Sequence, residues 1–266
     1  AKYYGYTNNI SNNKINNFQN KKIFFPKDSN NDNDELIIFS INKYCPGLPV
    51  KHTPYYIPIK EDNVLTLENI ANESKGVNHL GMFKADIDNL GGIFSFGLGE
   101  KVSLSRYASL SRMLNYFFSE YLYHLINSRE EYKNIYTVFS GGDDLCLIGP
   151  WNIIIDFAIE FQKNFQKFTG YNPNISISGG ISLNSDKLPV KTIASNTEKE
   201  LEKSKDFENK NAVTLFNTTV TWNEFERLIK YSDELYKLLK DDRFTKSFLY
   251  RLLKYSENAR KVKEGK

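Results

Sequence analysis

The order of apolar segments between residues 79 and 216 constrains the fold more than any other feature of the sequence. Short apolar runs predict strands over 79–85, 135–139, 145–148 and 175–183. Apolar residues spaced three or four apart predict helices over 103–126 and 151–168. The order is therefore strand, helix, strand, strand, helix, strand. A further helix over 190–205 and a strand over 212–216 follow.

That order is typical of the ferredoxin-like arrangement, in which helices pack against one sheet. In such a sheet the first strand lies beside the third and runs antiparallel to it. We therefore expect an α+β fold in which the first strand ends beside the turn that opens the third strand.

Two regions of different character flank this pattern. Ten asparagines lie between Asn8 and Asn33, and four prolines lie between residues 45 and 59, so the N-terminal part is expected to be irregular. It contains a predicted strand over 35–41 and a short helix with a linker over 61–75. From Trp222 onward the pattern is helical only and indicates a helical hairpin.

These changes predict three parts. They are an irregular α/β linker domain over 1–76, a central domain over 77–220 and the start of a helical C-terminal domain over 221–266. The first residue is Ala and the last residues carry no fold signal, so we expect a piece of a longer protein.

Composition excludes several classes of protein. The two cysteines, Cys45 and Cys146, are too few for a disulfide framework or a cysteine-based zinc site. No apolar run approaches the ~18 residues needed to cross a bilayer, so we expect a cytoplasmic protein with no membrane partner. The net charge is +3, and residues 222–266 carry 12 Lys and Arg against 8 Asp and Glu. Any attraction for nucleic acid is therefore mild and lies mainly in that C-terminal part.

Acidic residues lie at two points that the expected fold brings together. Asp86 and Asp88 end the first strand, and Asp143 and Asp144 lie in the turn that opens the third strand. Three or four carboxylates are therefore expected to converge at one edge of the sheet. Like charges repel at such distances unless a cation neutralises them. Carboxylate oxygens of this kind favour Mg²⁺ or Mn²⁺.

Each motif alone has a simpler interpretation. A Gly-Gly-Asp-Asp turn is most often an ordinary hairpin, and Asp-x-Asp at a strand end is a common solvated edge. The two motifs together, at positions that the topology brings into contact, favour a functional site. Gly141 and Gly142 would let a nucleotide approach the turn without a side-chain clash.

Lys205 is a further candidate. It lies four residues after Leu201, so it projects beside the buried face of its predicted helix. It could pair with Glu202 on the same helix, or it could hold a triphosphate. The sequence has no P-loop, and none of its three histidines precedes Asp, which excludes a His-Asp nuclease motif.

Several segments resemble the large subunit of type III-A (Csm-type) CRISPR interference complexes. They are FKADIDNLG at 83–91, SLSRYASLSR at 103–112 with FF at 117–118, SGGDDL at 140–145 with GPW at 149–151, ISGGI at 177–181, LEKSK at 201–205 and KNA at 210–212. The resemblance runs from about Leu80 to Trp222 and covers that family's second palm, which is related to polymerase and nucleotide-cyclase palms. Residues 1–75 resemble the domain before the palm, and residues 222–266 resemble the start of the family's helical C-terminal domain.

The resemblance implies an ATP-binding palm and a nucleotidyltransferase that converts ATP to 3′–5′ cyclic oligoadenylates when target RNA is bound. It implies a two-metal reaction with Mg²⁺ or Mn²⁺ and with ATP as the substrate. The implied catalytic residues are Asp86, Asp143 and Asp144. The implied metal ligands are the same three residues and Ile87. The implied nucleotide contacts are Asn89, Leu90, Gly91, Ser140, Gly141, Gly142 and Lys205.

The resemblance also implies partners. They are the other subunits of a CRISPR ribonucleoprotein complex, guide RNA and target RNA bound through that complex, and a first palm of the same full-length protein. The sequence lacks the family's His-Asp nuclease domain and its first palm. We therefore expect the isolated chain to bind nucleotide but to make little or no cyclic product.

Two other functions stay open. A diguanylate-cyclase-like enzyme shares the palm but uses GTP, and it usually carries Glu near the end of the turn, where this chain has Asp144. A non-catalytic palm would only dock neighbouring subunits, although it would have no reason to keep an uncompensated set of carboxylates. Base preference separates the first from the oligoadenylate hypothesis, and metal-dependent nucleotide binding separates the second.

Overall fold

The computed structural model describes the backbone of three short strands near the N-terminus and most of the chain from residue 56 onward. The described ranges are 22–24, 38–41, 50–51, 56–61, 63–97, 99, 103–243 and 245–263. Most of the predicted Asn-rich and Pro-rich segments, with Cys45 and His52, lies outside them. The short strands β1 (Lys22–Phe24), β2 (Ile38–Ile41) and β3 (Val50–Lys51) form a small sheet. β2 was expected, whereas β1 falls at the most apolar point of the segment predicted to be irregular.

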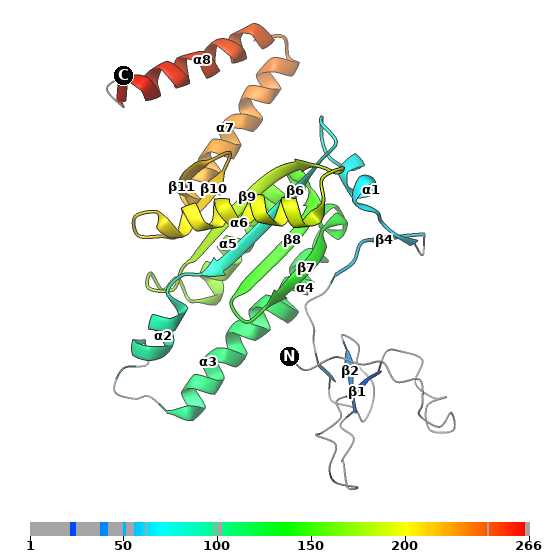
Figure 1. Ribbon diagram of the computed structural model, residues 1–266, viewed down its shortest axis with the longest axis vertical. Coiled ribbons are helices and arrows are strands. Elements are labelled where there is room, and N and C mark those ends of the chain that lie inside the picture. Colours follow the sequence, from blue (N-terminus) through cyan, green and yellow to red (C-terminus); the bar gives the residue numbers. More distant parts are fainter. Residues whose placement is uncertain are drawn as a thin grey trace.

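Six strands form the main sheet, in the order β11-β10-β9-β6-β8-β7 (Figure 1). They are β6 (His79–Ile87), β7 (Tyr136–Gly141), β8 (Asp144–Pro150), β9 (Ile177–Ser185), β10 (Ala212–Leu215) and β11 (Thr218–Thr221). Among β9, β6, β8 and β7 each strand is antiparallel to its neighbour, and β10 joins β9 in parallel. This order confirms the predicted ferredoxin-like palm, to which β10 and β11 are added beyond β9.

The predicted helices fall close to their expected ranges, whereas the helix over Leu90–Phe96 was not predicted. The helices are α1 (Leu67–Asn72), α2 (Leu90–Phe96), α3 (Leu104–Tyr116), α4 (Leu122–Ile126), α5 (Trp151–Phe168), α6 (Val190–Asp206), α7 (Trp222–Lys240) and α8 (Lys246–Lys263). A π-helical turn, η3 (Phe117–Tyr121), joins α3 to α4, so the helix predicted over 103–126 is continuous but locally widened. A 3₁₀ turn, η4 (Glu131–Asn134), precedes β7, and β4 (Ile59–Lys60) pairs with β5 (Asn63–Val64).

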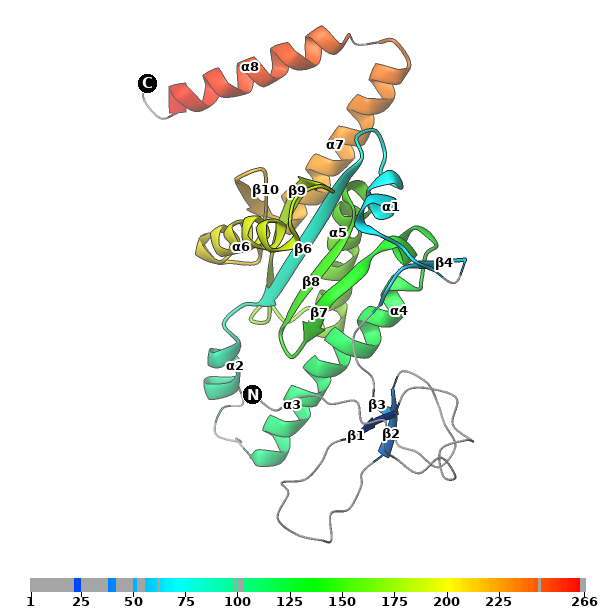
Figure 2. The same cartoon turned by 45° about the vertical axis from the view of Figure 1, so that its right-hand side comes forward.

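Alternate residues of β6 face two separate cores, as a strand covered on both faces requires. Phe83 and its odd-numbered neighbours join the larger core, where the Phe83 ring meets the Phe161 ring of α5 at 6.1 Å between centroids. Leu80 and Met82 join the smaller core with Ile193 of α6 and residues of α1. Figures 1 and 2 show α5 and α6 on opposite faces of the sheet. Even-numbered residues of β6 therefore face α6.

Two glycines of β9 let helices approach the sheet from both sides. A Cβ atom at Gly180 would lie 2.3 Å from the backbone nitrogen of Leu201 in α6. A Cβ atom at Gly179 would lie 2.9 Å from the ring of Trp222, which begins α7. The Trp222 indole also donates a hydrogen bond to the Ile177 carbonyl at 2.8 Å. The ISGGI segment of β9 is thus the part of the sheet on which α6 and the start of α7 pack.

Several features differ from the sequence predictions. Strand β11 was not predicted; Phe216 and Asn217, both with positive φ, form the tight turn that leads into it. Helices α7 and α8 diverge from the turn between them (Figures 1 and 2) and do not lie side by side as a hairpin would. The apolar spacing that predicted α3 does not bury its N-terminal end, because Leu104 is 87% exposed.

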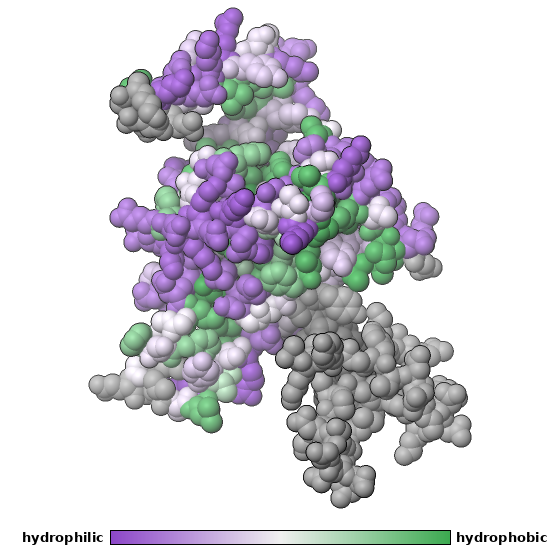
Figure 3. All heavy atoms as spheres, in the orientation of Figure 1, coloured by the Kyte–Doolittle hydropathy of each residue, from purple (hydrophilic) through white to green (hydrophobic). Residues whose placement is uncertain are grey.

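Hydrophilic side chains cover α6, while apolar side chains gather over α2 and α3 (Figure 3). Phe96 of α2 is 83% exposed and Met113 of α3 is 54% exposed. Within the part of the chain that the structure describes, no helix is both long and apolar enough to cross a membrane.

Candidate active site

The predicted meeting of the two acidic motifs is present in the sheet. Asp86, near the end of β6, lies directly opposite Asp144, the first residue of β8. Asp143 lies beside them in the turn, where its carbonyl accepts a hydrogen bond from the Ile87 backbone at 3.1 Å. We call Asp86, Asp143 and Asp144 the acid cluster. It faces the α6 side of the sheet, because Asp86 is an even-numbered residue of β6.

Burial and mutual repulsion both act on the acid cluster. Burial is the main cause that raises the pKa of Asp86, and the charges of Asp143 and Asp88 raise it further. Burial also raises the pKa of Asp144, followed by the charges of Asp143 and Asp86. Keeping these carboxylates ionised therefore costs free energy, and a nearby cation would lower that cost.

Lys205 provides one such cation. Its ammonium lies 2.7 Å from an Asp86 carboxylate oxygen, and this contact opposes the rise in the pKa of Asp86. The Lys205 side chain is 35% exposed and that of Asp86 is 24% exposed. Lys205 therefore reaches the acid cluster from α6, as its position beside the buried Leu201 suggested.

Asp88 has a different role from the one the sequence suggested. Its carboxylate accepts hydrogen bonds from the hydroxyls of Ser176 at 2.6 Å and Ser178 at 2.7 Å. It also accepts one from the Asn211 backbone at 3.1 Å. With only 3% of the residue exposed, Asp88 is committed to the fold. Of the three or four carboxylates expected at this edge, Asp88 is therefore the one outside the acid cluster, because these hydroxyls and the backbone amide already satisfy its oxygens.

The turn after Asp88 contains three of the predicted nucleotide contacts, Asn89, Leu90 and Gly91. Asn89 has a left-handed backbone with φ of 53°, and its side-chain oxygen accepts a hydrogen bond from Lys210 at 2.7 Å. Leu90 packs its side chain against the larger core, so only its backbone could face a ligand. A Cβ atom at Gly91 would meet no atom within 4 Å, so its backbone borders open space.

The hairpin turn is open on its outer side. Gly142 has φ of 69°, a conformation that favours glycine, and a Cβ atom at Gly141 or Gly142 would meet nothing within 4 Å. This openness is consistent with the predicted nucleotide approach. The Ser140 hydroxyl donates to the Phe118 carbonyl in η3 at 2.6 Å, so it anchors the hairpin to the long helix.

The chemistry of the acid cluster suits a hard cation, since carboxylate oxygens are the ligands that Mg²⁺ and Mn²⁺ prefer. Ile87 could add only its carbonyl oxygen, because its hydrocarbon side chain has no atom that binds a metal. Over the described residues, however, no three His, Cys, Asp or Glu side chains gather into a group that could hold a metal. A metal would therefore require side-chain rearrangement, beginning with the Lys205 contact to Asp86.

Lys84, which was not among the predicted site residues, lies two residues before Asp86 on the same face of β6. Its ammonium pairs with Glu198 of α6 and lies 5.9 Å from the centre of the Phe139 ring. Its charge counteracts the rise in the pKa of Asp144. The signal was present in the sequence, because residues two apart in a strand share a face.

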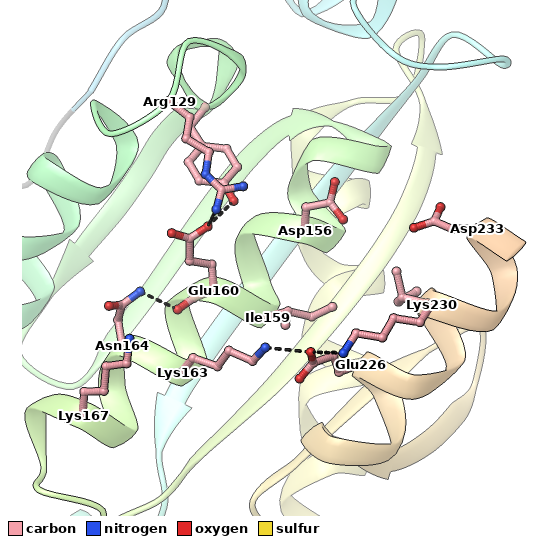
Figure 4. Close-up of a pocket in the computed structure, with 12 residues that line it drawn as sticks. Arg129, Asp156, Ile159, Glu160, Lys163, Asn164, Lys167, Glu226, Lys230 and Asp233 are labelled. Carbon is pink, nitrogen blue, oxygen red and sulfur yellow. Dashed lines mark hydrogen bonds and ion pairs between the residues drawn. The ribbon is translucent and has the colours of Figure 1, made fainter.

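A cleft of about 560 Å³ lies on the opposite face of the sheet, between α5 and α7 (Figure 4). Its charged side chains mostly pair with one another. Glu226 binds Lys163 at 2.7 Å and Lys230 at 2.8 Å, and Arg129 binds Glu160 at 2.7 Å. The cleft is therefore a salt-bridged contact between two helices, remote from the acid cluster.

Comparison with known proteins agrees with this geometry. The family model described as Cas10/Cmr2, second palm domain matches residues 79–214. The chain is 36% identical over 186 residues to the CRISPR system single-strand-specific deoxyribonuclease Cas10/Csm1 (subtype III-A) of Methanocaldococcus jannaschii. That match covers 61% of this chain and 23% of the relative. The chain spans about a quarter of the length of the curated relatives it matches.

Solved structures of Csm1 also resemble this chain. A Csm1-Csm4 cassette in complex with AMPPNP superposes with a TM-score of 0.70 and 26% identity, covering 83% of this chain and 36% of that chain. A Csm1-Csm4 cassette in complex with cA3 superposes with a TM-score of 0.65 and 25% identity, covering 73% and 31%.

Proposed function

The chain belongs to the Cas10/Cmr2 second palm domain family, and from this premise we propose that its acid cluster binds ATP for nucleotidyl transfer. The product would be a 3′–5′ cyclic oligoadenylate. The observation that carries the proposal is the meeting of Asp86, Asp144 and Lys205 from three separate elements. Two carboxylates beside a lysine supply both metal ligands and a cation for phosphate.

The acid cluster and the Ile87 carbonyl would hold two divalent ions, Mg²⁺ or Mn²⁺. When bound, such ions lower the pKa of a ribose 3′-hydroxyl and stabilise the charge of a leaving pyrophosphate. The residues of the chain position the substrate. Released from Asp86, the Lys205 ammonium would bind the triphosphate.

Neighbouring backbone would complete the phosphate site. The turn from Asn89 to Gly91 offers backbone donors beside open space. Gly141 and Gly142 leave room for the nucleotide, and Ser140 holds their hairpin in place. The 3′-hydroxyl oxygen of an acceptor nucleotide would then attack the α-phosphorus in line, and the bond to pyrophosphate would break.

The ligands of the solved relatives support ATP as the substrate. One Csm1-Csm4 structure contains AMPPNP, an analogue of ATP, and another contains cA3. These ligands favour the oligoadenylate hypothesis over a GTP-using, diguanylate-cyclase-like enzyme. They also weigh against a palm that serves only as a scaffold.

We also propose that this palm works within a larger assembly in the cytoplasm. The solved relatives contain Csm4, and the curated relatives are assigned to subtype III-A. A first palm of the same full-length protein would provide the acceptor nucleotide, while guide RNA and target RNA would act through the complex. The chain by itself would then bind ATP and make little or no cyclic product.

Calorimetric titration tests the proposal. ATP and GTP, each with Mn²⁺, would be titrated into the chain and into the variant Asp143→Asn/Asp144→Asn. We expect metal-dependent ATP binding that is at least about tenfold weaker in the variant, as loss of charged ligands predicts. Preference for GTP would support the cyclase alternative. An affinity for ATP that is the same without Mn²⁺ and in the variant would contradict the proposal.

A further inference from the structure

Two ion pairs of opposite polarity connect β6 to α6. Near the middle of β6, Lys84 pairs with Glu198 of the helix; two residues later, Asp86 pairs with Lys205. Lys84 and Asp86 share one face of the strand. Glu198 and Lys205 are seven residues apart and share one face of the helix. The strand and the helix thus present matching, charge-reversed patterns to each other.

The first pair is the more enclosed at its sheet end. The Lys84 side chain is 16% exposed, compared with 24% for Asp86, the sheet residue of the second pair. Lys84 lies between Cys146 and Gly180 in the register of the sheet, and α6 crosses directly over Gly180. The Lys84–Glu198 pair is therefore placed to fix α6 over the sheet.

The two pairs would respond differently to ligand. Under the proposed function, Lys205 leaves Asp86 when metal and triphosphate bind. Lys84–Glu198 then remains as the ion pair between β6 and α6 among the described residues. Hydrogen bonds also tie α6 to β9: the Thr197 hydroxyl bonds the Ser182 hydroxyl at 2.7 Å, and the Ser204 hydroxyl donates to the Gly179 carbonyl at 2.5 Å. Lys84–Glu198 adds a charged contact to β6 itself, and without it the Lys205 ammonium would be placed less firmly over the acid cluster.

We propose that Lys84 is a positioning residue that acts through Glu198 to hold α6 where Lys205 reaches the acid cluster. This inference rests on the proposed function for its substrate, ATP, but its structural part does not depend on nucleotide. The alternative role for Lys84 is a direct effect of its charge on the neighbouring Asp144. The two roles make different predictions.

A double-mutant cycle of Lys84→Met and Lys205→Met on the full chain tests the coupling. We expect Lys84→Met to weaken Mn²⁺-dependent ATP binding about fivefold in the wild-type background. In the Lys205→Met background the same change should cost less than about twofold, because its effect passes through Lys205. Equal losses in both backgrounds would overturn the proposal, since a general structural role predicts additivity.

Thermal unfolding of the same four variants without nucleotide separates the proposed function from the positioning role of Lys84. We expect the loss of melting temperature from Lys84→Met to be smaller when Lys205 is already Met. If ATP fails to bind but this coupling is present, the proposed function fails and the positioning role stands. If the unfolding effects are additive, the positioning role fails whatever the nucleotide result.

A charge swap, Lys84→Glu/Glu198→Lys, decides how Lys84 acts. An ion pair of reversed polarity would still hold α6, so we expect ATP binding within about threefold of wild type, against larger losses for Lys84→Glu alone. The swap also places a further carboxylate, at position 84 of β6, beside the acid cluster. If Lys84 acted on Asp144 directly, that negative charge would be harmful. Binding would then be at least as weak as in the single variant, which would overturn the proposal.

Discussion

The Lys205 ammonium lies 2.7 Å from an Asp86 carboxylate oxygen, so a cation of the protein itself covers a carboxylate that the proposed metal site needs. The same lysine is the proposed partner of the triphosphate. In the proposed site a metal and Lys205 would therefore compete for Asp86, and a nucleotide would relieve the competition by giving Lys205 a second anion. Binding of metal and binding of ATP should consequently reinforce each other.

Substitution of Lys205 should affect metal and nucleotide in opposite directions. We expect Lys205→Met to strengthen binding of Mn²⁺ alone by about threefold to tenfold, because the competing cation is removed. The same change should weaken ATP binding about tenfold or more, because a charged contact to phosphate is lost. Electron paramagnetic resonance of free Mn²⁺ and calorimetry with ATP measure the two effects. Weaker binding of Mn²⁺ alone would contradict this competition.

The acid cluster should make stability fall as pH rises. The pKa of Asp144 is higher in the folded chain than its ordinary value, mainly through burial and then through Asp143. As pH rises, the unfolded chain therefore releases this proton first, so the free energy of unfolding begins to fall at about pH 4. Once the pH exceeds the pKa of the folded state, this free energy stays at its lower value.

Asp144→Asn removes that charge. In metal-free buffer at pH 7 we expect a melting temperature about 1–2 °C above wild type, since a partly exposed charge contributes only a fraction of a kcal/mol. The difference should vanish below about pH 4, and excess Mn²⁺ should raise the melting temperature of the wild type more than that of the variant. Melting curves from about pH 3 to about pH 8 check this. A variant less stable than wild type at pH 7 would contradict it.

The close approach of α6 to β9 should make Gly180 intolerant of any side chain. A Cβ atom there would meet the backbone of Leu201 at 2.3 Å, which a helix backbone cannot avoid without shifting. We expect Gly180→Ala to lower the free energy of unfolding by about 1–3 kcal/mol and to weaken ATP binding by displacing Lys205. Gly92→Ala is the matched control, because its Cβ would meet nothing within 4 Å. Chemical denaturation of both variants is the measurement, and equal stabilities would refute the role of Gly180.

Asp88 should behave as a structural residue, unlike its neighbour Asp86. We expect Asp88→Asn to cost about 1.5–3 kcal/mol of unfolding free energy, because the charged acceptor of Ser176, Ser178 and the Asn211 backbone is lost. Asp144→Asn, with the same chemical change, should not destabilise. Urea denaturation in metal-free buffer compares them. If Asp88→Asn unfolds like wild type, the assignment of Asp88 to the fold is wrong.

The fold and the meeting of the acidic motifs were predictable because both depend on local pattern. Apolar spacing identified the strands, and the ferredoxin-like order then placed Asp86 opposite Asp144 without any knowledge of side chains. The tight turn at Phe216 was missed because its flanking strands are short and its residues are not the usual Gly or Asp.

Interactions between distant elements could not be predicted in the same way. The fate of Asp88 depends on hydroxyls some ninety residues later, at Ser176 and Ser178, which the sequence alone does not bring near. Lys205 was placed on the correct side of its helix, but its contact with Asp86 depends on how closely α6 lies over Gly180. Such distances follow from packing rather than from periodicity.

The most direct test of the account is to locate the metal. Crystals of the chain grown with Mn²⁺ and a non-hydrolysable ATP analogue would show manganese by its anomalous scattering. The account predicts manganese density in contact with Asp86 and with Asp143 or Asp144, and Lys205 turned from Asp86 to the phosphates. Nucleotide bound with no manganese at these carboxylates, or with Lys205 still on Asp86, would contradict it.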